Sequence, residues 1–207
     1  MHADQQDHWT QVYTQKAPSQ VSWFQAEPEA TLRALERLHV PSSSSFVDVG
    51  GGASNLVDAL LQRGWDDMTV IDIAGSALAA AKQRLGEKAA RVQWEVADIT
   101  EWQPPRRYDV WHDRAVFHFL TEPDQRAAYR RTLLKAIAPA GLVIMATFAL
   151  DGPEKCSGLP VQRYDAASLS AAIGSGFTPV EDWREEHLTP WGASQSFTWC
   201  VFRRNQN

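Results

Sequence analysis

The stretch Phe46-Val47-Asp48-Val49-Gly50-Gly51-Gly52-Ala53 decides the fold. Its first four residues are mostly apolar and predict a short buried strand, which three consecutive glycines then end. A helix follows over 54–63, with Gly64 placed to terminate it. Glycines let the backbone turn sharply and approach a ligand closely, and the first turn of a helix offers free amide donors. The stretch therefore predicts a strand, a binding loop and a helix in succession.

The chain on both sides of this stretch alternates between short apolar strands and helices. Further strands are predicted at 68–71, 91–96, 108–111 and 142–148, and helices at 7–13, 28–39, 77–85, 121–138 (capped by Thr121) and 165–173. Such alternation is typical of a parallel sheet with helices on both faces. Two final strands, 177–187 and 195–203, have a short link and predict an antiparallel hairpin. We therefore predict an α/β fold with a single doubly wound, mostly parallel sheet of about seven strands and an antiparallel C-terminal hairpin.

Composition argues against several classes of protein. The net charge is −5 and no run of Lys and Arg forms a basic face, so a nucleic-acid partner is not expected. No apolar run is long enough to span a membrane, and the polar, acidic start is not a signal peptide. The two cysteines, Cys156 and Cys200, suit a reducing, cytoplasmic setting. No metal site is predicted.

The glycine loop is compatible with more than one kind of nucleotide site. The phosphate-loop pattern GxxxxGK followed by Ser or Thr is absent, and the dinucleotide pattern GxGxxG fails at Asn55. Acidic residues instead stand near the ends of three successive strands, at Asp48, Asp72 and Asp98. A strand-end carboxylate accepts hydrogen bonds from ribose hydroxyls. Strand-end carboxylates without a phosphate-binding loop favour a ligand that contains adenosine but no phosphate.

From about Phe46 to Phe148 the sequence resembles the class I S-adenosylmethionine-dependent methyltransferases, with a looser match to the end. The resemblance implies an enzyme with S-adenosylmethionine as its cofactor. It places Asp48, Gly50, Gly51 and Gly52 against the amino-acid portion of the cofactor, Asp72 on its ribose, and Ile73, Asp98 and Ile99 around its adenine. Two departures from the family pattern are Ala53-Ser54, where many members have another glycine, and Ala140 within Pro139-Ala140-Gly141.

The segment 111–119 matches the stretch of the family that faces cofactor and substrate. His112 and Asp113 lie on opposite faces if the strand continues that far, so only one would face the cofactor. We expect Asp113 and Arg114 near the charged end of the cofactor, and His118 near the substrate. Cys156, in the insert 151–163, is a third catalytic candidate beside Asp113 and His118.

The whole chain, 1–207, is expected to form one methyltransferase domain. Its parts are an N-terminal helical and lid segment (1–40), a cofactor-binding core (41–150), and a substrate-side insert with the C-terminal hairpin (151–207). The aromatic residues of the first part have two candidate roles, a lid over the cofactor or the packing of an extra helix: Trp9, Tyr13, Trp23 and Phe24.

Function is expected to be methyl transfer to a small-molecule acceptor by in-line displacement, with a thiol or another soft nucleophile among the candidates. The alternatives are a protein (lysine) methyltransferase and, less favoured, a non-catalytic module that binds S-adenosylmethionine. A dinucleotide oxidoreductase is disfavoured by Asn55. The protein is expected to be a monomer or a homodimer.

Overall fold

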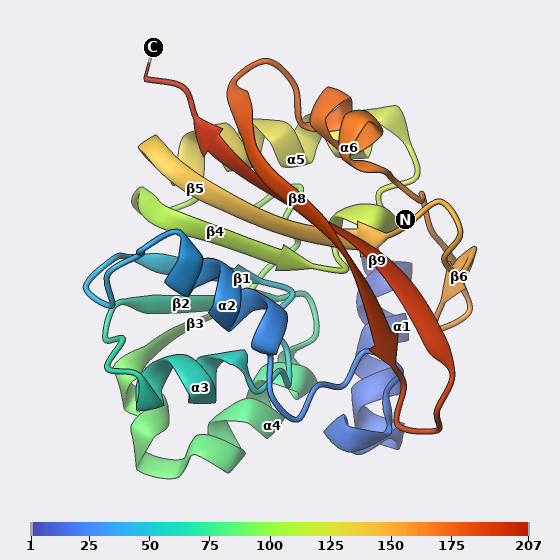
Figure 1. The fold of residues 1–207 in the computed structure, drawn as a ribbon. Helices are drawn as coiled ribbons and strands as arrows, with labels where there is room; N and C mark the ends of the chain where they lie inside the picture. The colour runs from blue at the N-terminus through green and yellow to red at the C-terminus, as the bar shows by residue number, and fades with distance from the viewer. Residues whose placement is uncertain (1, 207) are drawn as a thin grey trace.

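A twisted sheet forms the centre of the computed structural model, which describes residues 2–206 and the side chains of 5–206 (Figure 1). Met1 and Asn207, the ends of the predicted domain, lie outside the described residues. Within this range the sheet has seven strands in the order β3-β2-β1-β4-β5-β9-β8. The strands are β1 (Phe46–Val49), β2 (Met68–Asp72), β3 (Val92–Val96), β4 (Tyr108–Arg114), β5 (Ile137–Phe148), β8 (Phe177–Leu188) and β9 (Ser194–Arg204). The first five are mutually parallel, whereas β9 runs antiparallel to β5 and β8, which confirms the predicted fold.

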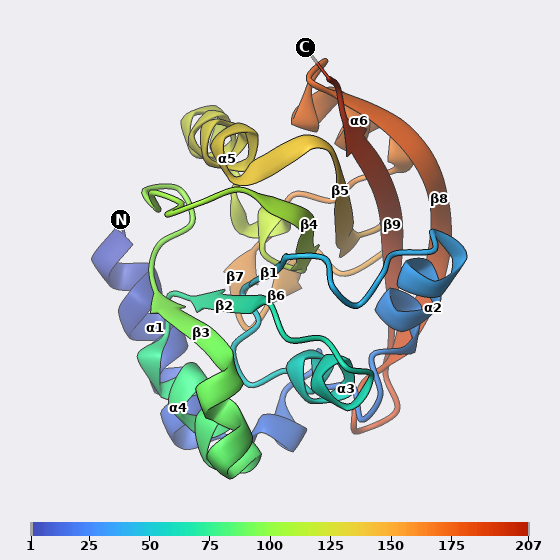
Figure 2. The same ribbon diagram turned by 90° about the vertical axis from the view of Figure 1, so that its left-hand side faces the viewer.

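Helices cover both faces of this sheet. They are α1 (His2–Gln15), α2 (Glu29–Arg37), α3 (Leu56–Gln62), α4 (Gly75–Leu85), α5 (Pro123–Ala136) and α6 (Ala166–Ile173), with 3₁₀ turns η1 (Pro18–Gln20), η2 (Gly86–Arg91) and η3 (Phe117–Phe119). Figure 2 shows α2 and α3 on one side of the sheet and α5 and α6 on the other. This two-sided cover explains why the central strands are buried along almost their whole length.

Several predicted boundaries differ from the structure for local reasons. Helix α5 begins at Pro123 rather than Thr121, because the Gln125 side chain accepts a hydrogen bond from the Glu122 backbone N–H and fixes Glu122 as the cap. Strand β5 begins at Ile137, which pairs with Tyr108 before the register shifts. The predicted insert contains a small hairpin that the sequence analysis missed, formed by β6 (Lys155–Cys156) and β7 (Leu159–Pro160).

Alternation along β4 divides its side chains between two cores. Val110 belongs to the core under α2 and α3, and Trp111 belongs to the core under α5 and α6. Asp113 and Arg114 are consecutive residues of β4, so their side chains project from opposite faces of the sheet. The direction of this alternation decides which polar residues can reach a ligand at the end of β4.

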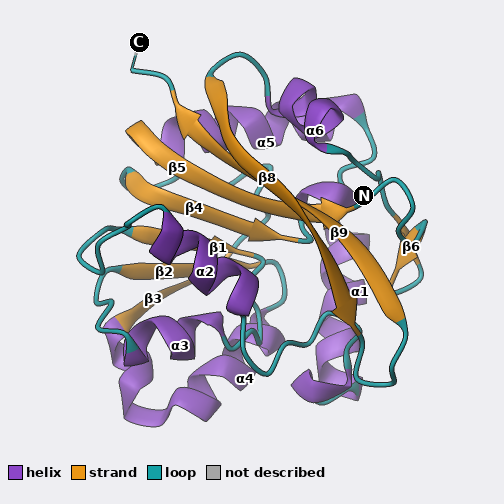
Figure 3. Cartoon of the chain, viewed as in Figure 1, coloured by secondary structure: helices purple, strands orange, loops and turns teal. Residues whose placement is uncertain are grey.

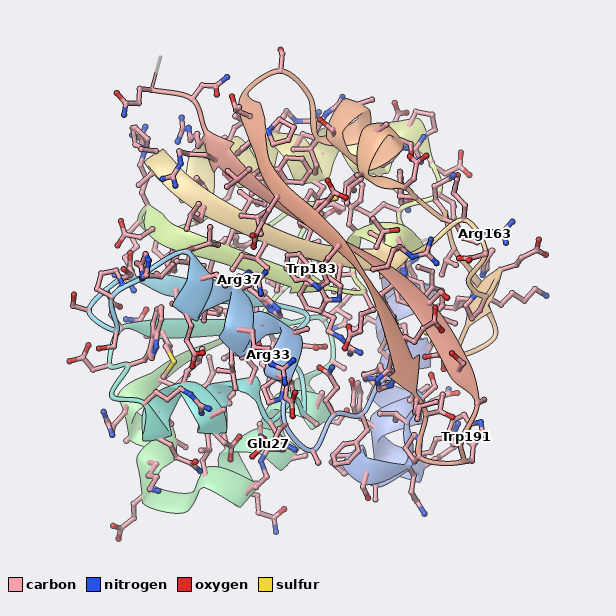
Figure 4. The ribbon with its side chains drawn as sticks, viewed as in Figure 1. Glu27, Arg33, Arg37, Arg163, Trp183 and Trp191 are labelled. Carbon is pink, nitrogen blue, oxygen red and sulfur yellow. The ribbon has the colours of Figure 1, made fainter. Side chains whose placement is uncertain are left out.

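The carboxyl ends of the parallel strands are covered by segments from both ends of the chain. In Figure 1, α1, β6 and the tip of the β8–β9 hairpin gather at this end, and Figure 3 shows the loop after α1 passing beneath the hairpin tip to reach α2. Figure 4 shows Arg37 of α2 beside Trp183 of β8, where the guanidinium lies 4.8 Å from the ring centroid and pairs with Glu181 at 2.7 Å. The hairpin therefore holds the N-terminal part of the chain in place. No helix among residues 2–206 combines the length and the apolar character needed to cross a bilayer.

Candidate active site

A partly open cavity of ≈ 830 Å³ lies at the carboxyl ends of β1 to β4, where the strand order reverses. Its floor comes from the strand ends and its cover from the N-terminal segment and the insert. The lining residues are Gln5, Trp9, Tyr13, Trp23, Val49, Gly50, Ile71, Asp72, Ile73, Ala97, Asp98, Ile99, Arg114, Ala115, Val116, Phe119, Leu120 and Cys156. A largely apolar wall with a few polar groups is typical of a small-molecule site.

A second cavity of ≈ 590 Å³ adjoins the first around the glycine loop. The two share Tyr13, Trp23, Val49, Gly50 and Arg114. The second one is further lined by Pro18, Val21, Phe24, Gln25, Pro28, Thr31, Asp48, Gly51, Ala53, Ser54, Asn55, Leu56 and His112. One elongated ligand could therefore extend from the ends of β2 and β3 across the glycine loop.

Asp72 closes β2 with a buried carboxylate. Its Oδ1 accepts a hydrogen bond from the Ala74 backbone N–H at 2.8 Å. Burial, reinforced by the nearby charge of Asp48, raises the pKa of Asp72 to about 7 despite hydrogen bonds from backbone N–H groups. Additional hydrogen-bond donors would stabilise the ionised form of this buried carboxylate, and the hydroxyls of a ribose are such donors.

The segments that follow β2 and β3 contribute two apolar side chains with an acid beside them. Ile73 and Ile99 line the larger cavity with Asp98, whose Oδ1 accepts hydrogen bonds from the backbone N–H (2.8 Å) and hydroxyl (2.7 Å) of Thr100. These contacts fix the direction of the carboxylate. The arrangement suits a flat aromatic ring with an amino group at its edge.

The glycine loop is closely packed around acidic side chains. Gly50 has φ +67°, and a Cβ at Gly51 would lie 2.5 Å from Asp48 Oδ2. A Cβ at Gly52 would lie 2.7 Å from Asp72 Oδ2, although Gly52 itself lines neither cavity. Gly50 and Gly51 thus form cavity wall, whereas Gly52 allows the loop to pack against Asp72.

Asp48 is held by a buried chain of hydrogen bonds that the sequence analysis did not foresee. Asp48 Oδ1 lies 2.7 Å from His112 Nδ1, and His112 Nε2 lies 2.9 Å from the Thr31 hydroxyl of α2. His112, rather than Asp113, is therefore the residue of this pair that faces a cavity. Because side chains alternate along β4, the sequence could have shown that His112 and not Asp113 faces a cavity only if the face of one neighbouring residue had been known.

Asp113 requires a correction, because it lines neither cavity. Its carboxylate points into the core under α5, where it accepts hydrogen bonds from Tyr129 Oη at 2.5 Å and from the backbone N–H groups of Val116 and Phe117. Burial raises its pKa to about 6. The structure makes Asp113 the anchor of the turn after β4, outside both cavities.

His118 also requires a correction. Its ring is fully buried between Phe119 and Phe148, and Nδ1 accepts a hydrogen bond from the Phe148 backbone N–H at 3.3 Å. Burial, with the positive charge of Arg114 nearby, lowers the pKa of His118 to about 3. A neutral imidazole of such low basicity that lines neither cavity does not suit the role of general base.

Cys156 does line the larger cavity, as a residue of the small β6–β7 hairpin. Burial raises the pKa of its thiol to about 12, so it remains protonated at neutral pH. The position fits the expected substrate side of the site. The protonated state does not fit a nucleophile.

Arg114 occupies the boundary between the two cavities. Its Nη1 donates a hydrogen bond to the Trp23 carbonyl at 2.9 Å, and its guanidinium lies 4.8 Å from the Phe197 ring centroid. Burial lowers the pKa of Arg114 to about 10, which still leaves it charged at neutral pH.

The N-terminal aromatic residues cover the site. Trp9 packs edge-on against Trp23 and Phe119, and Trp23 Nε1 donates to the Tyr13 hydroxyl at 3.3 Å. His187 of β8, which lines neither cavity, binds the Ser22 carbonyl through Nε2 at 2.7 Å.

Asn55, the residue that breaks the dinucleotide pattern, donates hydrogen bonds to the carbonyls of Gln25 and Ala26. This departure from glycine therefore has a physical role, which is to tie the N-terminal segment to the loop. Sequence analysis did not single out Ala97 and Leu120 as lining residues, because small and apolar side chains carry no chemical signal, and it gave no role to Gln5.

Comparison with known proteins agrees with this geometry. A family model described as a methyltransferase domain matches residues 46–141. Malonyl-[acyl-carrier protein] O-methyltransferase of Anoxybacillus flavithermus is 32% identical over 117 residues, which are 56% of this chain and 43% of that protein. The chain thus matches less than half the length of this curated relative.

Solved structures share the fold at low sequence identity. One, reported for the conversion of a disulfide bond into a thioacetal group during echinomycin biosynthesis, has a TM-score of 0.78 and 19% identity, covering 98% of this chain and 92% of that one. The 1,6-didemethyltoxoflavin-N1-methyltransferase of Burkholderia thailandensis has a TM-score of 0.68 and 20% identity, covering 98% and 85%. The family model thus identifies residues 46–141 as a methyltransferase domain, and the solved structures show that the described residues share the fold of an S-adenosylmethionine-dependent methyltransferase.

The described residues fit S-adenosylmethionine. Asp72 and Asp98 offer carboxylates at successive strand ends for hydroxyl and amino donors, and Ile73 and Ile99 offer apolar contacts for a ring. The adjoining cavity around Gly50 and Gly51 would hold the amino-acid portion. The buried carboxylate of Asp72, which lines the larger cavity at the end of β2, is the observation that supports this fit most directly.

Proposed function

We propose that this chain transfers a methyl group from S-adenosylmethionine to a small-molecule acceptor, with a thiol or another soft nucleophile among the candidates. The observation that carries the proposal is the covered cavity at the switch point, with Asp72 at one end and Arg114 at the other. The chain's own residues would bind the donor, align the acceptor and exclude water. We further propose the three-part division of the chain made above, with residues 1–40 as the cover.

Substitution of Asp72 by Asn is expected to weaken the binding of S-adenosylhomocysteine by at least about tenfold, because the amide loses one acceptor site and the negative charge. Isothermal titration calorimetry on both proteins measures the effect, with NADH as a control ligand. Asp66→Asn is the matched control, since Asp66 is exposed and precedes the opposite end of β2. Absence of S-adenosylhomocysteine binding by folded wild-type protein would contradict the proposal, and binding of NADH instead would indicate a dinucleotide site.

The affinity for S-adenosylhomocysteine is also expected to rise with pH. Burial holds the pKa of Asp72 at about 7 in the free protein, and ribose hydroxyls donate to the ionised form. The ionised fraction increases about tenfold between pH 6 and pH 8, so the affinity should increase by a similar factor. Titrations at these two pH values measure it. A flat profile for Asp72→Asn is the expected control, and an equally steep profile in that variant would assign the effect to another group.

Labelled S-adenosylmethionine distinguishes this proposal from its alternatives. Label in small molecules of a cell extract supports it, whereas label in protein bands supports a protein methyltransferase. Binding of the donor with no label transferred in either fraction supports a non-catalytic module.

A further inference from the structure

Asp48 is the one acid among the described residues that line the second cavity. Its carboxylate lies beneath the glycine loop, where Oδ2 would be 2.5 Å from a Cβ at Gly51. The proposed function places the amino-acid portion of the donor in this cavity, and that portion carries an α-ammonium group at neutral pH. Opposite charges attract strongly where little water screens them, so the ammonium group is expected to bind beside Asp48.

The carboxylate of Asp48 stands in an unfavourable place for a negative charge. It is buried, and a buried carboxylate is costly unless other groups pair with it. A second buried carboxylate is close by, since burial raises the pKa of Asp72 and the charge of Asp48 raises it further. Asp48 therefore needs a hydrogen-bond donor of its own to remain ionised and in one orientation.

His112 supplies this donor from the neighbouring strand. Asp48 of β1 and His112 of β4 are direct partners in the parallel pairing of the two strands, and His112 Nδ1 lies 2.7 Å from Asp48 Oδ1. An ionised carboxylate can only accept, so Nδ1 carries the proton that is shared between them. The backbone of the sheet thus fixes both ends of the hydrogen bond.

The ring of His112 is itself held on its other sides. Its Nε2 lies 2.9 Å from the Thr31 hydroxyl, which donates to Nε2 when the ring is neutral. The ring is stacked near Phe46, with centroids 6.0 Å apart and planes at 28°, and Trp199 lies 6.3 Å away by the same measure. These contacts select one orientation of the imidazole and one of its two tautomers.

Thr31 connects this arrangement to the N-terminal part of the chain. It is a fully buried polar residue of α2, and its hydroxyl is directed at His112. Helix α2 is in turn fixed to β8 by the ion pair between Arg37 and Glu181. The position of the imidazole therefore depends on α2 as well as on the sheet.

We propose that His112, held by Thr31, is a positioning residue that fixes the carboxylate of Asp48 for the α-ammonium group of the methyl donor. This inference rests on the proposed function and adds the residues that determine how the amino-acid portion is recognised. Asp48 makes the contact with the ammonium group, and His112 acts through Asp48. A carboxylate that is already oriented loses no conformational freedom when the ligand binds, which favours ligands that carry the amino group over those that lack it.

The test measures this preference on the full chain by calorimetry. The two probes are S-adenosylhomocysteine and its deaminated analogue, in which hydrogen replaces the amino group. Wild-type protein is expected to bind S-adenosylhomocysteine at least about tenfold more tightly than the analogue, because only the first offers a charged donor to Asp48. In His112→Phe, which keeps a ring but no donor, the affinity for S-adenosylhomocysteine should fall at least about tenfold and that for the analogue should stay within about twofold.

Two further variants separate positioning from packing. His112→Asn places an amide donor near the position of Nδ1 and is expected to restore S-adenosylhomocysteine affinity to within about threefold of wild type. Thr31→Val keeps the shape of the residue and removes its hydroxyl, so the preference should fall in the same direction by a smaller factor, about threefold. His118→Phe is the matched control, because His118 is an equally buried histidine that lines neither cavity and should leave the preference unchanged.

The two ligands together separate failure of this inference from failure of the proposed function. Equal weakening of both ligands in His112→Phe, or no recovery in His112→Asn, would overturn the inference by assigning His112 to packing alone. Wild-type protein without a preference for the amino group would also overturn it. If circular dichroism shows that His112→Phe does not fold, an unchanged preference in Thr31→Val has the same meaning. Folded wild-type protein that fails to bind S-adenosylhomocysteine refutes the proposed function itself.

Discussion

A chain that begins at Gln25 is expected to turn over its substrate at least about 100-fold more slowly than the full chain, because loss of the cover admits water and misplaces the reactants. Trp9, Tyr13 and Trp23 line the cavity, and Trp23 also provides the carbonyl that holds Arg114. Donor consumption, measured as S-adenosylhomocysteine release, checks the rate. Circular dichroism checks that the sheet persists, as expected from a core built on β1 to β5.

Point variants control for the removal of so much chain. The double variant Trp9→Ala, Trp23→Ala keeps the backbone of the segment and removes its largest contacts with the cavity. It is expected to reduce turnover in the same direction as the truncation. Unchanged turnover in both proteins would contradict the role as a lid and would leave the packing of an extra helix as the role of the N-terminal segment.

Substitution of Asp113 by Ala is expected to lower the free energy of unfolding by about 3–4 kcal/mol, since it leaves several buried donors without an acceptor. These are the Tyr129 hydroxyl and the backbone N–H groups of Val116 and Phe117. Urea denaturation followed by fluorescence measures the change. Affinity for S-adenosylhomocysteine should fall as well, because the same turn positions Val116 in the cavity wall.

Tyr129→Phe is the matched control for this substitution. It removes one donor to Asp113 and also the acceptor of the Trp111 indole N–H. The expected loss is about 1–2 kcal/mol, smaller than that of Asp113→Ala. If Asp113→Ala left stability unchanged and abolished only catalysis, Asp113 would be a catalytic residue and the structural assignment would be wrong.

The sequence contained enough information to predict the sheet, because each parallel strand is a short apolar run between turn residues. The glycine loop and the acids at the ends of β2 and β3 were also recognisable, since their spacing depends on the strands alone. The sequence did not show on which face of the sheet each residue of β4 lies. Asp113 was expected near the cofactor, yet a shift of one residue in a period of two directs it into the opposite core.

Contacts between residues that are far apart in the sequence could not be predicted either. His118 sits in a segment typical of the family's site, but the burial that lowers its pKa comes from Phe148 and Phe119 in the folded state. Glu185, whose charge acts on Arg114, accepts its hydrogen bonds from Trp199 and Gln25, and these partners are 14 and 160 residues away along the chain. A single sequence gives no measure of such pairings.

The contact between His187 and the Ser22 carbonyl has a consequence for the order of events during synthesis. The cover of the site emerges from the ribosome before β8, yet residues of β8 hold it: His187 binds Ser22, and Glu181 pairs with Arg37. Domains generally fold as units, and contacts of long sequence separation form late. A nascent chain arrested before β8 would thus carry the glycine loop and strand-end acids but no closed site, so the newborn protein should acquire activity only after β8 and β9 are made.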